Sequence, residues 1–547
     1  MAGVTTPDGL TYSVDWLICR DGYLSAWGWV VHRNAAVSAV RLLCVTPGAT
    51  TPVESRYGVA RGDAPDNSGF VVFGRAPLET VTRAVLEATL TTGAMHRIEL
   101  DLAAVSGAAG HPPHVLRRLG PAGPLARVRL RWTWARTLLE YVWRQGRHRW
   151  VRMRGRNLPR FRAAERGVTP LTLDRILDVL GPNPARPLSL MIDSNLGGGT
   201  THYREQRIQR HVDAGGTVIL FSYDFHRLRY AVRAVTRGRD ESFATDSLHP
   251  LVMLAAALPC DDLFLNSVCS FPDPLLVVSL SRQLRRLMRS TLTVAIHDFL
   301  CVCPSWNLLN DRGRFCGVPD RSECRRCLPH IGGEVRSLVA CNDIDRWRAV
   351  WGECLADATT ILCFSRSSRD LVERAYPDLR PDAWVIQPHA PSPLSPTPRA
   401  PAPLDRPLHI GVVGEITRQK GAAIVLEMTR LIRDRGLPVH LTVIGHLEGA
   451  RPSPLLHVLG PYAREQLPTL VAECSANVFF LPSIWPETFS YVAEELMQLG
   501  VPVAVFDMGA PAERVALYEP GLLIDRVDAA HALEQLIAFH ARLGAAR

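Results

Sequence analysis

The chain has 547 residues, of which 47% are hydrophobic and 21% charged, and its formal net charge is +9. This length exceeds what one hydrophobic core supports, and the composition excludes disordered and fibrous proteins, so we expect several folded domains. No apolar run reaches the roughly 18 residues that a membrane span needs. The N-terminus also lacks a basic stretch followed by an apolar core, which favours a soluble, cytoplasmic protein.

Residues 1–106 alternate short apolar stretches with turn signals, which predicts a small accessory domain that resembles a β-sandwich. The aromatic residues Trp27, Trp29 and Tyr57 suggest a carbohydrate-stacking face, although aromatic residues on strands more often belong to the core. Strands are expected at residues 25–31, 40–45, 69–73 and 84–90.

Residues 107–185 form a predicted helical linker that is unusually basic. Between Arg117 and Arg166, fifteen arginines stand against two acidic residues, and several Trp residues are interleaved. A basic amphipathic helix of this kind can lie on an anionic membrane surface, which would make the protein peripheral on the inner face of a membrane. The alternatives are a solvated linker helix packed by its Trp residues and, less favoured, a nucleic-acid surface.

Residues 186–390 alternate strands and helices, which predicts a Rossmann-like lobe with a parallel sheet. The first strand runs into a glycine-rich loop ahead of a helix expected from His202, so backbone amides can approach an anion there. The loop residues concerned are Gly197, Gly198, Gly199 and Thr200. A tight turn without a ligand is the alternative. His297 follows a later strand at its carboxyl end, either as a substrate contact or as a hydrogen-bonded wall residue.

A cysteine-rich insertion occupies residues 301–341 of this lobe. Four of its cysteines have the spacing C-x12-C-x7-C-x2-C, namely Cys303, Cys316, Cys324 and Cys327. Four thiolates suit a tetrahedral zinc ion and would close its coordination shell, so we expect a structural rather than a catalytic metal. Uncoordinated thiols and an iron–sulfur cluster are the alternatives. Substitute ligands are available in Cys301, His330 and Cys341.

A proline-rich linker at residues 391–404 precedes a second Rossmann-like lobe at residues 405–547. Its first strand ends at Gly414, and a loop with Lys420 and Gly421 leads into a helix. Lys420 is the sole lysine of the chain. Arginine and lysine differ in shape and hydration, so a compact ammonium is expected to be required there. Tyr462 lies in a predicted base-binding loop.

The stretch from Pro482 to Arg514 is the most informative one. An apolar strand, a polar loop and a helix follow one another, with Glu487 on the loop and Glu495 eight residues later in the helix. Ligands of open α/β sheets bind at the carboxyl ends of strands, and a carboxylate accepts two hydrogen bonds from a vicinal diol. The pair therefore suits a sugar and a ribose. The alternative is one carboxylate at a helix N-terminus and one that is solvated.

The glutamate spacing and the Lys420-Gly421 pair resemble the E-x7-E signature and the K-G element of retaining glycosyltransferases of family 4, over roughly residues 186–545. The resemblance implies an α/β GT-B fold, in which two Rossmann-like lobes face one cleft. It implies that Glu487 touches the donor sugar, that Glu495 touches the nucleotide ribose and that Lys420 neutralises the donor diphosphate.

The same resemblance assigns expectations to the remaining site residues. The loop from Gly197 to Thr200 would close over the donor phosphates and the acceptor, and His297 would lie near the acceptor and the donor sugar. Glu415 stands where the family pattern has Arg, and Arg418 is the cation expected to compensate.

The sequence therefore predicts a retaining glycosyltransferase that moves a sugar from a nucleotide-diphosphate sugar to a glycan or lipid-linked acceptor, without a catalytic metal. Envelope polysaccharide synthesis is the expected context. A phosphorylase or sugar-nucleotide epimerase on the same fold is one alternative, and a non-catalytic glycan-binding protein is the other.

Overall fold

A computed structural model describes residues 4–20, 23–53, 55–59, 68–75, 83–100, 173–180, 185–195, 197–224, 229–245, 251, 255, 258, 260–271, 273–331, 343–394, 403–451 and 453–545. The chain forms two compact units. The first contains the described residues up to 195 and those from 205 to 293. The second contains residues 197–204 and those from 294 onward. The basic stretch between residues 117 and 166 lies outside the described residues.

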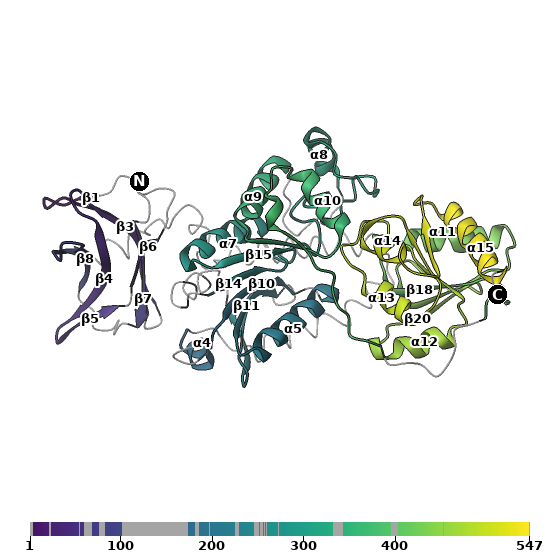
Figure 1. Cartoon of the computed structure of the whole chain (residues 1–547), viewed down its shortest axis with the longest axis horizontal. Coiled ribbons are helices and arrows are strands. Elements are labelled where there is room, and N and C mark those ends of the chain that lie inside the picture. Colours follow the sequence, from purple (N-terminus) through teal and green to yellow (C-terminus); the bar gives the residue numbers. More distant parts are fainter. Residues whose placement is uncertain are drawn as a thin grey trace. The chain divides into compact units, whose positions relative to one another are not determined.

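Antiparallel strands begin the first unit (Figure 1). One sheet has the order β1-β2-β3-β7-β6 and the other the order β5-β4-β8-β9. Their buried side chains form one shared core, as predicted for a sandwich-like domain. The strands are β1 (Val4–Thr5), β2 (Leu10–Arg20), β3 (Tyr23–His32), β4 (Val37–Thr46), β5 (Ala49–Val53), β6 (Ser55–Val59), β7 (Gly69–Arg75), β8 (Arg83–Leu90) and β9 (Met95–Leu100).

The suggested carbohydrate-stacking face is wrong for Trp29. Its side chain is buried, although the residues of β3 that belong to the shared core between the two sheets are Ala26 and Val30. The hydroxyl of Tyr57 donates a hydrogen bond to the Val30 carbonyl at 3.0 Å. The side chain of Trp27 lies outside the described residues. Trp29 is therefore not available as part of an exposed stacking face.

The first unit also carries strands in the order β13-β12-β11-β10-β14. The parallel neighbours of β10 are β11 and β14, and all seven residues of β10 are buried. The hairpin of β12 and β13 continues the sheet antiparallel. The elements are α4 (Leu173–Leu180), β10 (Leu188–Ser194), α5 (Gly198–Asp213), β11 (Thr217–Asp224), β12 (Arg229–Val235), β13 (Asp240–Thr245), β14 (Asp262–Leu265), α7 (Pro274–Met288) and β15 (Thr291–Ala295).

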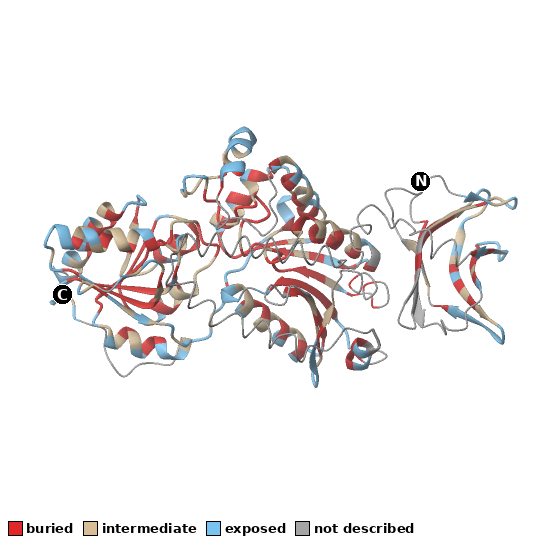
Figure 2. Ribbon diagram, turned by 180° about the vertical axis from the view of Figure 1, so that it is seen from behind, coloured by how far each residue is buried: buried red, intermediate tan, exposed pale blue. Residues whose placement is uncertain are grey.

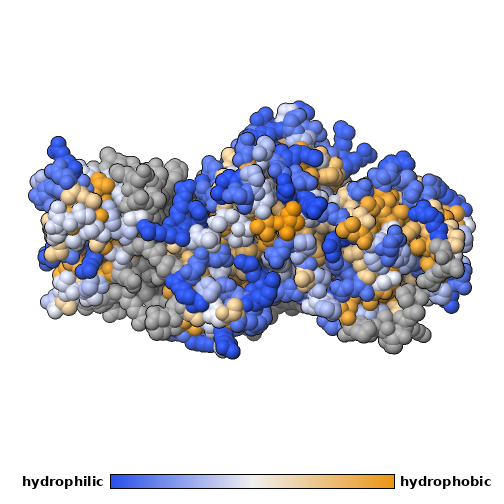
Figure 3. Space-filling model, in the orientation of Figure 1, coloured by the Kyte–Doolittle hydropathy of each residue, from blue (hydrophilic) through white to orange (hydrophobic). Residues whose placement is uncertain are grey.

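The second unit continues through the cysteine-rich segment, which we define as residues 298–331. Within this segment, apolar side chains such as Phe299, Val302 and Leu308 are buried. The surface over α8 is mostly hydrophilic (Figure 3), and no residue of that helix is buried. The elements are α8 (Arg321–Cys327), α9 (Ile344–Asp357), β16 (Thr360–Cys363), α10 (Arg366–Ala375) and β17 (Trp384–Ile386), with β16 and β17 parallel.

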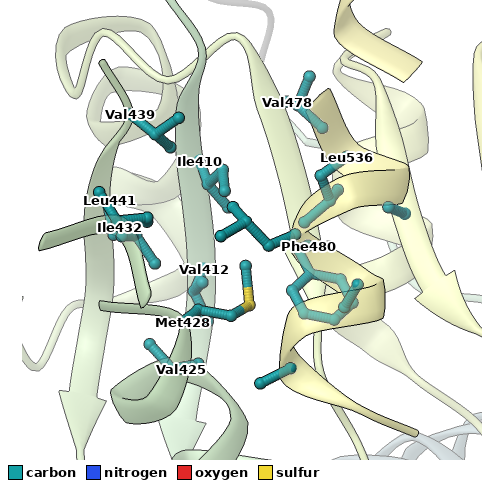
Figure 4. Close-up of a cluster of buried hydrophobic side chains, with 14 of the residues drawn as sticks. Ile410, Val412, Val425, Met428, Ile432, Val439, Leu441, Val478, Phe480 and Leu536 are labelled. Atoms are coloured by element: carbon teal, nitrogen blue, oxygen red, sulfur yellow. The ribbon is translucent and has the colours of Figure 1, made fainter. Parts of the chain in front are cut away.

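The C-terminal part of this unit is a parallel sheet in the order β20-β19-β18-β21-β22-β23. Its central strands are buried along their length (Figure 2). Apolar clusters cover the sheet, and α11 and α15 pack beside each other over one of them (Figure 4). The elements are β18 (His409–Ile416), α11 (Ala422–Asp434), β19 (His440–Leu447), β20 (Leu456–Gly460), α12 (Leu467–Glu473), β21 (Val478–Leu481), α13 (Tyr491–Gln498), β22 (Val503–Phe506), α14 (Gly509–Val515), β23 (Gly521–Ile524) and α15 (Ala529–Ala545).

No helix in the described part of the chain combines the length and the apolar character that crossing a bilayer requires.

Candidate functional site

The predicted cation and the first predicted carboxylate meet in the structure. Glu487 lies in the loop after β21, and Lys420 Nζ donates a hydrogen bond to its Oε2. The Glu487 side chain is 8% exposed and that of Lys420 is 36% exposed. The ammonium is therefore partly exposed, and its three rotatable donors leave it able to contact a ligand as well as its carboxylate partner.

Three glycines hold the backbone near Lys420 in place. Gly421 is the N-cap of α11 with φ +86°, and a Cβ there would lie 1.9 Å from the Pro482 carbonyl oxygen. Gly414 ends the predicted strand with φ +119°, and a Cβ on Gly445 would lie 2.2 Å from the Gly414 oxygen. Only glycine permits these conformations and approaches, so the lysine loop is pressed against the end of β21.

The second carboxylate, Glu495, belongs to the second turn of α13 and is buried. Arg464 Nε donates to its Oε1 at 2.6 Å, and Arg464 Nη2 donates to the Ser392 carbonyl at 2.5 Å. Burial raises the pKa of Glu495 above its ordinary value, and the charge of Arg464 opposes this rise. Burial and the charge of Glu495 raise the pKa of Tyr462 to about 12, so the predicted base-loop residue lies beside this glutamate.

Replacing Arg464 by Ala should make nucleotide binding more sensitive to acid. Without the guanidinium the pKa of Glu495 rises further, because burial is then less opposed. The carboxylate becomes protonated at a higher pH and can accept fewer hydrogen bonds from the ribose that the resemblance assigns to it. Affinity for a nucleoside diphosphate, measured by calorimetry between about pH 5 and pH 8, should fall at higher pH in the variant than in the wild type. Identical pH profiles would contradict this.

Glu415, at the position where the family pattern has Arg, points to a histidine. Its Oε1 lies 2.8 Å from Nδ1 of His446, and its side chain is 68% exposed. The compensating Arg418 lies in the next loop, where its backbone N–H donates to Glu448 Oε2 at 2.9 Å. The compensation expected of Arg418 stays a prediction.

The glycine loop is shorter than predicted. Helix α5 begins at Gly198 rather than at His202, so Gly198, Gly199 and Thr200 lie in its first turn. The first N–H groups of any helix lack partners within the helix, so the amides of this first turn keep the ability to donate to an anion that was expected of the loop. Gly197 precedes the helix with φ +87°, and a Cβ on Gly199 would lie 2.9 Å from the Tyr491 ring. The helix start is therefore packed against α13.

His297 is a buried wall residue beside the glutamate loop. Its carbonyl accepts a hydrogen bond from Thr488 Oγ1 at 2.8 Å, one residue beyond Glu487. Its ring stacks on Phe364 at 4.4 Å. Burial, followed by the charge of His389, lowers the pKa of His297 well below its usual value. The imidazole is therefore neutral at physiological pH.

The sequence reasoning missed two residues, Arg464 and His389. His389 Nδ1 lies 2.8 Å from the Tyr491 hydroxyl, and the His389 ring stacks on Phe489 at 4.5 Å. Burial lowers the pKa of His389 to about 3. The only available signal was its position shortly after a strand, at the start of the proline-rich stretch. Arg464 gave no signal, because Arg is abundant in this chain.

The four predicted zinc ligands form no disulfide bonds. Burial raises the pKa of Cys303 to about 12 and that of Cys316 to about 11, and in both cases the neighbouring cysteines add to the rise. Within the described ranges, no group of three or more His, Cys, Asp or Glu side chains is arranged to hold a metal ion. The substitute ligand Cys341 lies outside those ranges. Zinc binding therefore stays a prediction.

Comparison with known proteins identifies the class of the C-terminal lobe. Residues 398–541 match the family described as glycosyl transferases group 1. The matching stretch includes Lys420, Glu487 and Glu495. With the Rossmann-like sheets, this match confirms the predicted α/β GT-B fold class.

Similar solved structures are distant. Anabaena Alr3699/HepE in complex with UDP-glucose shares 13% identity with a TM-score of 0.41, covering 66% of this chain and 95% of that one. A glycosyltransferase from Rickettsia africae ESF-5 shares 10% with a TM-score of 0.41, covering 65% and 89%. The pneumococcal O-GlcNAc transferase GtfA, in complex with UDP and GlcNAc, shares 10% with a TM-score of 0.35, covering 60% and 62%. No curated protein matches.

Proposed function

We propose that this protein is a retaining glycosyltransferase of family 4 that transfers a sugar from a nucleotide-diphosphate sugar to a glycan or lipid-linked acceptor. The contact between Lys420 and Glu487 carries the proposal, because it joins a phosphate-binding cation to a sugar-binding carboxylate within the group 1 glycosyl transferase domain. Glu495 would hold the ribose, with Arg464 as its partner.

The reaction breaks the bond between the anomeric carbon and the leaving diphosphate oxygen. Positive charge develops on the sugar and negative charge on the diphosphate, so fixed cations at the diphosphate lower the barrier most. Lys420, with Arg418 as the second cation, would supply this stabilisation. The acceptor hydroxyl oxygen forms the new bond to the anomeric carbon, and its proton passes to the leaving diphosphate. No metal is required for these steps.

An assay of acceptor-dependent nucleoside diphosphate release tests the proposal. A first screen would measure thermal stabilisation by nucleotide sugars, because a bound donor raises stability by mass action. A donor that stabilises the protein should then release its diphosphate only when an acceptor glycan is added. Release that requires inorganic phosphate instead of a glycan would indicate a phosphorylase, and interconversion of the free nucleotide sugar would indicate an epimerase.

We propose two further properties on sequence grounds. Residues 117–166 would contact an anionic membrane surface, and the acceptor would belong to envelope polysaccharide synthesis at the cytoplasmic face. Vesicles containing anionic lipid should therefore retain the full chain at low salt, whereas neutral vesicles should not.

The second property is structural zinc at the four clustered cysteines. Metal analysis of the purified chain should find about one zinc per chain. The paired variant Cys324→Ser with Cys327→Ser should lose it, whereas Cys474→Ser, a partly exposed thiol of the other lobe, should keep it. A wild-type protein that contains no metal after purification without chelators would refute the zinc site.

A further inference from the structure

The cysteine-rich segment is fixed to the helices beside it by hydrogen bonds to its own carbonyl groups. Trp347 Nε1 of α9 donates to the Leu300 carbonyl at 2.6 Å. From the end of α10, the Tyr376 hydroxyl donates to the Cys301 carbonyl at 2.5 Å. Arg348 Nε donates to the Val302 carbonyl at 3.2 Å, Arg374 Nη1 donates to the Gly317 carbonyl at 2.6 Å, and Arg325 pairs with Asp345. The segment is therefore a well-anchored part of the fold.

A tight turn lies within this anchored segment. The Asn310 side chain accepts hydrogen bonds from the backbone N–H groups of Arg312 and Arg314, both at 3.0 Å. Gly313 donates to the Asn310 carbonyl at 2.9 Å, and its φ of +71° is left-handed. A side-chain amide that bridges two backbone N–H groups in this way fixes the course of a turn.

Gly313 lies directly against the guanidinium of Arg418. A Cβ at Gly313 would lie 2.6 Å from Arg418 Nη2, closer than non-bonded atoms approach. Arg418 precedes Lys420 by two residues, and its backbone is held by Glu448. The turn of the cysteine-rich segment thus reaches the loop that carries the proposed diphosphate cations, and a side chain at Gly313 would force the guanidinium of Arg418 to move.

We propose that the cysteine-rich segment is a wall of the donor site, and that Gly313 is a positioning residue that places Arg418 for the donor diphosphate. The inference rests on the proposed function and assigns the segment a role within it. It also explains the departure at Glu415, whose carboxylate is directed to His446. Arg418 supplies the missing cation on a long side chain, and the turn at Gly313 limits the conformations that this side chain can adopt.

The inference is tested by measuring how much the second phosphate of a nucleotide adds to its affinity for the full chain. The nucleoside diphosphate that binds best among UDP, GDP and ADP is compared by calorimetry with its monophosphate. Gly313→Ala should weaken the diphosphate roughly tenfold, which is the range of one charge-assisted contact, and should change the monophosphate little. In an Arg418→Ala background the same substitution should have no further effect, because coupled residues are not additive.

Gly500→Ala is the matched control. Gly500 has nearly the same φ, +70°, and no atom lies within 4 Å of the Cβ that would be added. It therefore reproduces the backbone strain without the steric contact and should leave the preference for diphosphate unchanged. If Gly313→Ala does not fold, Asn310→Ala loosens the same turn without touching Arg418 and should give the same selective loss.

Three results would overturn the inference: an equal loss for both nucleotides, an unchanged diphosphate affinity in Gly313→Ala and Asn310→Ala, or an effect that persists without Arg418. A wild-type chain that binds none of the three diphosphates would instead refute the proposed function.

Discussion

Replacing Lys420 by Ala is expected to lower kcat/KM for sugar transfer by about 10²- to 10³-fold, the range for removing one preorganised group that stabilises transition-state charge. Its ammonium contacts the buried Glu487 and can move to the leaving diphosphate. Without it, the diphosphate loses its nearest proposed cation, and the carboxylate of Glu487 loses its partner. Steady-state kinetics with a fixed acceptor would measure the loss.

The Lys420→Arg variant separates charge from shape. A planar guanidinium is larger and more rigid than an ammonium, so it should restore little activity although it keeps the charge. Arg435→Ala removes an exposed cation of the same lobe, which pairs with Glu534, and should leave activity unchanged. Near-normal turnover in Lys420→Ala would exclude Lys420 from the reaction.

Replacing Gly421 by Ala is expected to lower the free energy of unfolding by about 3 kcal/mol, the upper range for overpacking or for a strained backbone. The added methyl would lie 1.9 Å from the Pro482 carbonyl oxygen, at a residue whose φ is +86°. The start of α11 must shift, and Lys420 moves with it. Donor binding should therefore fall together with stability.

Gly436 provides the control from the opposite end of α11. Its φ is +58°, and no atom lies within 4 Å of an added Cβ. Gly436→Ala should cost about 1 kcal/mol through backbone strain alone. Chemical denaturation would compare the two variants, and equal losses would show that the contact with Pro482 is unimportant.

The sequence predicts the parallel strands well where burial is complete. The apolar run from Val478 to Leu481 became β21, and Ser490 caps α13 where the predicted helix begins. The hairpin of β12 and β13 was missed, because its pattern mixes arginines and acidic residues with apolar ones. These charged side chains pair across the hairpin, as in the contact between Arg233 and Asp240. Such pairs form only once the strands are aligned, so the sequence pattern alone does not reveal them.

In the candidate site, too, some contacts could be predicted from the sequence and others could not. The contact between Lys420 and Glu487 could be anticipated, because both follow strands that end at one edge of a sheet. Arg464 and Glu495 are 31 residues apart, and no short motif joins them. The early start of α5 was missed because glycines usually indicate a loop. Local patterns thus identify groups that follow strands, whereas partners brought together by packing require the structure.

The ion pair between Lys420 and Glu487 has a consequence for selectivity against small anions. Free phosphate would have to separate the pair and would leave a buried carboxylate with no new partner, because phosphate brings no sugar hydroxyls. A ligand that carries both a phosphate and a sugar satisfies both members at once. The unliganded protein should therefore ignore the abundant inorganic phosphate of a cell and respond only when both chemical groups arrive in one molecule.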